Sequence, residues 1–143
     1  MKAHLIILFL LFGTTSFAQK VTLVSQELNK HQNIRDFCIA ANEAYFTIQS
    51  PNQDLSQIVV VKNKDWKNPV LLPFCDGYSY LEPFLSNDGK KLYFASDRPL
   101  KDGETKKKDF DIWYVERENN NSHWSKPKNL GIPVNSDEDE FYP

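Results

Sequence analysis

Glycine, cysteine and an excess of either charge are all scarce in this sequence. Only five of the 143 residues are glycine and 25% are charged, which argues against collagen-like and highly charged disordered chains. Seventeen basic and nineteen acidic residues give a net charge of −2. Because binding to phosphates requires a clear basic excess, nucleic acid is not expected as the main partner. The composition also argues against a polytopic membrane protein, and the length allows one small domain at most.

The first eighteen residues have the order of a secretory signal peptide. A basic start, Met1–His4, precedes an apolar run over residues 5–12, and Ser16 and Ala18 then form a small-residue pattern before Gln19. A run this short cannot cross a bilayer core of about 30 Å. We therefore predict cleavage after Ala18 and a periplasmic or secreted protein with no stable membrane span. No cysteine follows the apolar run, which argues against a lipid anchor.

Residues able to perform catalysis are few. After removal of the leader the histidines are His31 and His123, far apart in the chain, and no nucleophile elbow, zinc-protease motif or phosphate loop occurs. Cys38 and Cys75 have a spacing that fits no metal motif. An oxidising compartment allows either a disulfide between them or, slightly favoured, two buried free thiols. We predict that the protein is not an enzyme and has no catalytic, cofactor-binding or metal-binding residue.

Strand signals are dense in the remainder of the chain. Six short segments are rich in β-branched or aromatic residues and are bounded by turn formers, namely 21–24, 37–40, 44–48, 58–61, 91–96 and 112–116. The rival helical window, 27–44, is diluted by asparagines. Asp88-Gly89 predicts a hairpin over 84–96, because Gly89 can adopt the positive φ of a tight turn. Residues 84–130 are predicted to form four antiparallel strands in an up-and-down meander.

Three of these strands are apolar on both faces. Residues 58–61, 92–95 and 112–115 show no alternation of apolar and polar side chains, as a sheet with one wet face would. Both faces should therefore be buried, and with no amphipathic helix available we expect another sheet on each side.

An internal repeat indicates how such sheets could arise. Tyr45-Phe46 matches Tyr93-Phe94, Ile58 matches Ile112, and Trp66-x-x-Pro69 matches Trp124-x-x-Pro127. A period of this size, with four short strands, is typical of a propeller blade. We therefore predict an all-β fold of about two four-stranded antiparallel propeller blades. The predicted divisions are a signal peptide at 1–18, an N-terminal strand and linker at 19–34, a degenerate blade at 35–80, a blade at 81–136 and the start of a third blade at 137–143.

The second unit has a recognisable pattern. Residues 81–98, which read LEPFLSNDGKKLYFASDR, and then Asp111-Ile112-Trp113 closely resemble the WD40-like β-propeller repeat of TolB-type proteins. The continuation over 124–136 is similar to the spacer into the next blade of that family. The match covers residues 81–143, whereas 35–80 lacks the Asp-Gly turn and the Ser-Asp-Arg triplet.

The residues of this pattern have physical roles that are structural. Asp88 and Gly89 shape the hairpin, and Asp97 and Arg98 can cap strand ends or pair with Asp111. The large core side chains are those of Trp113 and Trp124. Lys106–Lys108 is expected as a charged hairpin tip, and Asp137–Glu140 as a solvated connection between blades.

The resemblance implies a scaffold that binds a protein or a cell-envelope polymer. Two alternatives remain open: the propeller part of a larger peptidase or glycan-processing hydrolase, and a glycan-binding module in which Tyr78 and Tyr80 line the rim. Because propellers close with about four to eight blades, the apolar faces at the two ends also predict aggregation or self-association of the chain.

Overall fold

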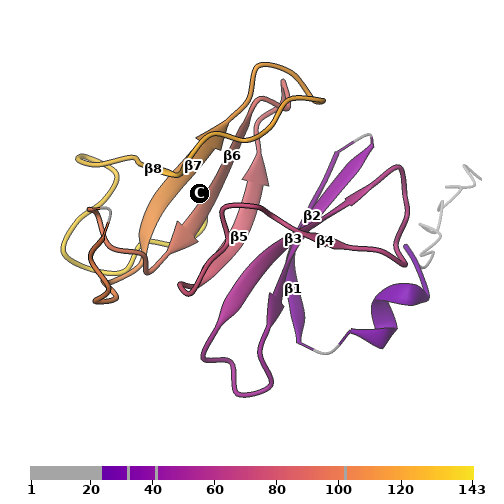
Figure 1. The fold of residues 1–143 in the computed structure, drawn as a ribbon, viewed down its shortest axis with the longest axis horizontal. Helices are drawn as coiled ribbons and strands as arrows, with labels where there is room; N and C mark the ends of the chain where they lie inside the picture. Colours follow the sequence, from indigo (N-terminus) through magenta and orange to yellow (C-terminus); the bar gives the residue numbers. More distant parts are fainter. Residues whose placement is uncertain (1–23, 32, 41, 102) are drawn as a thin grey trace, which may run out of the picture.

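The computed structural model describes residues 24–143 apart from 32, 41 and 102, and these residues form two four-stranded sheets (Figure 1). All strand pairs are antiparallel, and each sheet follows the order of the chain. Sheet A contains β1 (Ile34–Ile39), β2 (Glu43–Gln49), β3 (Ser56–Lys62) and β4 (Val70–Leu71). Sheet B contains β5 (Tyr80–Leu85), β6 (Lys91–Ser96), β7 (Asp111–Glu116) and β8 (Lys128–Asn129). A single 3-10 turn, η1 (Glu27–Lys30), precedes sheet A.

The all-β prediction and the four-stranded meander over residues 84–130 are confirmed. Five of the predicted strands correspond to β1, β2, β3, β6 and β7. The predicted leader, and the predicted strand at 21–24 apart from Val24, lie outside the described residues. Val24 itself is exposed and belongs to no strand. Among the described residues, no helix has the length and apolar character needed to cross a membrane.

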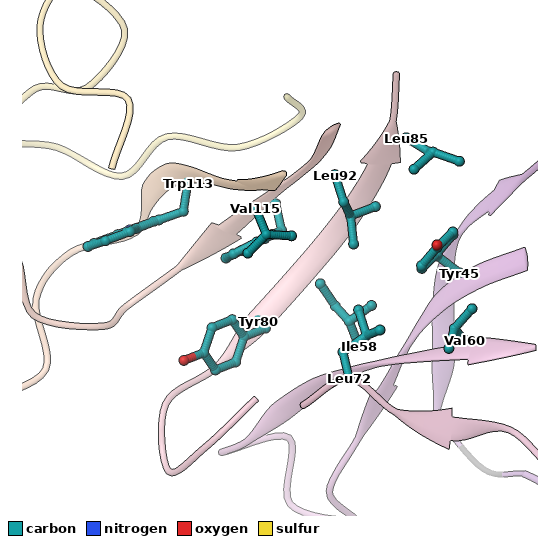
Figure 2. Packing of buried hydrophobic residues seen from close by; sticks show 10 residues of the cluster. Tyr45, Ile58, Val60, Leu72, Tyr80, Leu85, Leu92, Trp113 and Val115 are labelled. Atoms are coloured by element: carbon teal, nitrogen blue, oxygen red, sulfur yellow. The ribbon is translucent and has the colours of Figure 1, made fainter. Parts of the chain in front are cut away.

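The inner faces of the two sheets pack against each other and form the main core. Figure 2 shows side chains from both sheets meeting in one layer, with Tyr45 and Ile58 on one side and Leu92 and Val115 on the other. The side chains of Tyr45, Ile58, Leu92 and Val115 are completely buried. Because side chains alternate along each strand, one apolar face of each sheet packs against the other sheet.

The outer faces are covered differently from the expectation of a further sheet on each side. The outer face of sheet A packs against Leu28 of η1 and against Trp66, which follows β3. The outer face of sheet B packs against Phe110 and Leu130. Within the described residues the expectation was wrong, because single side chains from the flanking segments, and no third sheet, pack on each outer face. The buried apolar residues of these faces are Ala44, Phe46, Val59 and Val61 in sheet A and Leu81, Ala95 and Ile112 in sheet B.

The first strand of each sheet contains a bulge at the same point of the repeat. The pairing register shifts between Arg35 and Cys38 in β1 and between Leu81 and Phe84 in β5. Asp36 and Glu82, which lie in these bulges, have left-handed φ values of 58° and 57°. Tyr142 has the same backbone conformation, with φ 60°, and its N–H donates to the Glu82 carboxylate at 2.6 Å.

The two cysteines are free thiols and are not joined to each other. Cys38 accepts a hydrogen bond from the Leu85 N–H, and the Cys75 thiol faces the Ile58 carbonyl. Both side chains pack at the margin of the main core. Of the two states open at the sequence level, the structure therefore has the pair of free, partly buried thiols.

Candidate functional site

The two sheets are joined at one end by Arg117, which follows β7. Its guanidinium pairs with the Glu43 carboxylate of sheet A at two points, with distances of 2.6 Å for Nη2–Oε2 and 3.1 Å for Nη1–Oε1. The other N–H groups donate to the Gly89 carbonyl and to two oxygens of Asn120. All five guanidinium donors are thus bound, and the group lies 4.3 Å from the ring centroid of Trp124. We call this arrangement the arginine joint.

The electrostatics of the arginine joint favour its ionised form. Burial by itself raises the pKa of Glu43, but hydrogen bonds from Arg117 and from the Tyr45 hydroxyl outweigh burial and hold that pKa below its ordinary value of 4.5. Burial also raises the pKa of the Tyr45 phenol well above its usual range. Tyr45 therefore remains a hydrogen-bond donor to Glu43, at 2.9 Å, and the carboxylate stays negative at neutral pH.

Asp88 and Gly89 lie in the turn between β5 and β6. Asp88 accepts hydrogen bonds from the Ser86 hydroxyl at 2.6 Å and from the Lys90 N–H at 3.0 Å, and these bonds lower its pKa. Gly89 has a φ of +71°, and a Cβ placed on it would lie 2.8 Å from Oδ1 of Asn120. Because that oxygen is bound within the arginine joint, the turn and the joint form one unit.

Asp97 and Arg98 follow β6 and have separate contacts. Asp97 is buried, accepts the Ser79 N–H at 2.7 Å just before β5 begins, and lies 2.8 Å from Nζ of Lys107. The guanidinium of Arg98 lies 5.0 Å from the ring centroid of Trp113. Asp97 thus fixes the start of β5, and Arg98 covers a tryptophan of the core.

Asp111 is part of a buried polar cluster at the start of β7. It accepts a hydrogen bond from Asn129 at 3.0 Å and lies 3.2 Å from Nζ of Lys108. The Asn135 amide bonds both the N–H and the carbonyl of Ile112, at 2.8 and 3.0 Å. An asparagine side chain therefore occupies the place that a neighbouring strand would take beside β7, and it holds the C-terminal segment there.

The two tryptophans of the pattern occupy different environments. Trp113 is 3% exposed and belongs to the main core. Trp124 is half-buried, meets the ring of Tyr45 edge-on at a centroid distance of 6.5 Å and packs against the same core. Trp124 is thus the pattern residue that bridges the core and the surface.

A groove of about 710 Å³ opens between the connections that follow β4 and β6 and the segment before β8. We call it the aromatic groove. Its aromatic lining consists of Phe74, Tyr78 and Trp124, and its charged lining of Asp76, Arg98, Lys101, Glu104 and Lys126. Tyr78 is positioned by its hydroxyl, which donates to the Glu104 carbonyl at 2.8 Å. Tyr80, in contrast, is completely buried, so it belongs to the core and cannot line a rim.

A second pocket, of about 490 Å³, lies at the turn end of the sheets, above the arginine joint. We call it the turn pocket. It is formed by the β1–β2 connection, by the end of β3, by the 86–89 turn and by the loop after Arg117. Cys38 also lines this pocket.

Sequence reasoning did not find the arginine joint. Arg117 and Glu43 are 74 residues apart, and neither stands in a motif; the one local signal is an arginine at the end of an apolar strand. The lysines of 106–108 were expected as a charged tip, whereas Lys107 and Lys108 each bind a buried carboxylate.

Comparison of the chain with protein-family models, with curated proteins and with solved structures finds no match. Within the described part of the chain, no group of three or more histidine, cysteine or acidic residues could hold a metal ion. The function must therefore be argued from the geometry of the grooves and of the residues that hold them.

Proposed function

We propose that this chain is an exported, non-enzymatic β-propeller repeat scaffold that binds a protein or a cell-envelope polymer. The aromatic groove carries the proposal, because half-exposed aromatic rings beside charges of both signs are suited to stacking on sugars or on apolar side chains. Other residues of the pattern, such as Asp97 and Asp111, are engaged in internal contacts. They build a rigid frame and leave the groove as the surface for a partner.

The repeated architecture supports the propeller part of this proposal. Both sheets have the same strand order, and their inner faces pack together as neighbouring blades do. The bulges at Asp36 and Glu82 occur at matching places, and Tyr142 repeats their backbone conformation at the start of the proposed third blade. Cleavage after Ala18 and the periplasmic or secreted location stay part of the proposal, and N-terminal sequencing of the exported protein tests both.

Self-association is a further part of the proposal. Several large apolar side chains are exposed, among them Ile39 at the end of β1, at 59%, and Ile132 in the segment after β8, at 91%. Burial of such side chains between copies is favourable. Sedimentation of the purified chain should reveal dimers or larger species. A single monomeric species at all concentrations would contradict the proposal of self-association.

The binding function is tested with a photoreactive residue placed at Tyr78 and, as matched control, at Tyr142. Tyr142 is 83% exposed and lies outside the aromatic groove. We expect crosslinks from position 78 to one envelope protein, or co-sedimentation with purified cell-wall sacculi that Trp124→Leu abolishes. Equal crosslinking from both positions, together with no sedimentation on sacculi, would refute the proposal.

A further inference from the structure

The turn pocket has an unusual surplus of carboxamide side chains. Four connections contribute asparagines to its lining: Asn42 between β1 and β2, Asn63 after β3, Asn87 in the β5–β6 turn and Asn121 after β7. All four are exposed, and within the described part of the chain none of these four amides forms a hydrogen bond with the protein. They are therefore available to a ligand.

Backbone conformation explains one of these asparagines and not the others. Asn63 has a φ of 52°, a left-handed conformation that asparagine tolerates well. The backbones of Asn42, Asn87 and Asn121 do not have positive φ. Turn preference remains a general reason for asparagine at each place, but it does not bring the amides of separate connections around one pocket.

The charges in the pocket lining cancel. Glu43 and Asp88 are matched by Lys62 and Arg117, and Glu43 is paired with both bases, at 3.2 and 2.6 Å. A metal ion or a phosphate would meet no net opposite charge here. The lining thus favours an uncharged ligand that offers donors and acceptors together, since each carboxamide presents both.

Most residues that line the pocket are polar. Of its fifteen lining residues, only Cys38, Ile39, Ala40 and Leu85 are apolar. A bound peptide needs apolar pockets for alternate side chains as well as partners for its main chain. A saccharide needs hydroxyl-matching amides and fits a cavity of this volume, which lies in the range of small-ligand sites of about 300–1,000 Å³.

We propose that the turn pocket binds a neutral saccharide unit through the amides of Asn42, Asn87 and Asn121. The arginine joint forms its floor, and because every donor of Arg117 is already bound, the pocket is preformed and a ligand need not order it. This site is separate from the aromatic groove, so it adds a second binding site to the function proposed above and does not depend on it.

The test is a titration of the full chain with neutral oligosaccharides, followed by calorimetry and by saturation-transfer NMR. The probes are triacetylchitotriose, cellotriose, maltotriose and mannotriose, with a heparin tetrasaccharide and a neutral hexapeptide as comparison ligands. We expect saturable binding of at least one neutral trisaccharide. The triple change N42A/N87A/N121A should weaken this binding about tenfold or more, because each amide contributes hydrogen bonds.

Two controls make the result decisive. Asn52→Ala removes an exposed asparagine outside the pocket and should leave binding unchanged. The triple variant should keep the melting temperature of the wild type, since its amides are exposed. Flat titrations with all four saccharides, equal binding by the triple variant, or preference for the heparin or peptide probe would each overturn the proposal.

Discussion

Replacement of Arg117 by methionine is the most informative perturbation of this fold. Methionine keeps an unbranched apolar stem that can still pack on Trp124, but it removes all five N–H donors. Glu43 would then be left with Tyr45 and Lys62 as its partners. The substitution therefore separates the charge and hydrogen bonding of the arginine joint from its packing.

The expected loss follows from the burial of the pair. Side-chain exposure is 1% for Arg117 and 11% for Glu43, and removal of one partner of a buried ion pair costs about 3–5 kcal/mol. Because Glu43 keeps some exposure and two other partners, we expect the lower end, about 3 kcal/mol. For a domain of this size that corresponds to a fall in melting temperature of roughly 10 °C.

Urea denaturation followed by tryptophan fluorescence measures the free energy of unfolding, and a double-mutant cycle with Glu43→Gln isolates the pair. We expect a coupling energy of about 1.5–3 kcal/mol. Lys128→Met is the matched control, because its ion pair with Glu116 is exposed and its loss should change the free energy of unfolding far less. A loss below about 1 kcal/mol for Arg117→Met, or additive single changes in the cycle, would refute the reasoning.

Three other predictions concern the same region and the thiols. Gly89→Ala should lower the free energy of unfolding by about 2 kcal/mol, since alanine resists the left-handed φ and its Cβ would clash with the bound Asn120; an unchanged urea midpoint would disprove this. Because the pKa of Glu43 is lowered in the folded state, the contribution of its charge to the free energy of unfolding is complete above pH 4.5 and is lost as the pH falls through the folded pKa. Glu43→Gln should therefore make the free energy of unfolding depend less steeply on pH in the acid range. Burial raises the pKa of Cys75 to about 12, so iodoacetamide at pH 8 should label Cys75 only after denaturation, as read by mass spectrometry with Cys38→Ser as the simplified background. A single disulfide in the unreduced protein would contradict the free-thiol state.

Local patterns predicted the strands well where side-chain chemistry and turn chemistry agreed. The Asp88-Gly89 turn located the β5–β6 hairpin, and the apolar runs located β3, β6 and β7. The fourth strand of each sheet was expected in number, but the bounds of the two-residue strands β4 and β8 were not predicted, because these strands are defined by pairing with a neighbour and carry no periodicity of their own. The first residues of β5 were also missed, because its bulge interrupts the alternation.

The features that organise the site are non-local, and the sequence offered no pattern for them. Arg117 meets Glu43 only because two sheets pack face to face. Similarly, the Asn135 side chain can form hydrogen bonds with the backbone of β7 only because the C-terminal segment returns to that strand. Such contacts depend on the relative placement of sheets, which composition and spacing do not specify. The covering of the outer faces by Leu28 and Trp66 was mispredicted for the same reason.

The extra residue in β5 determines which side chains face which way. Tyr80 and Leu85 are five positions apart, an odd number, yet both belong to the layer between the sheets. Strict alternation would place their side chains on opposite faces of the sheet. The inserted residue near Glu82 therefore reverses the alternation halfway along the strand. Deletion of that single residue would shorten the chain by less than 1%, but it would move the side chains of half of the strand to the opposite face of the sheet. The matching bulge in β1 places the same constraint on the length of that strand.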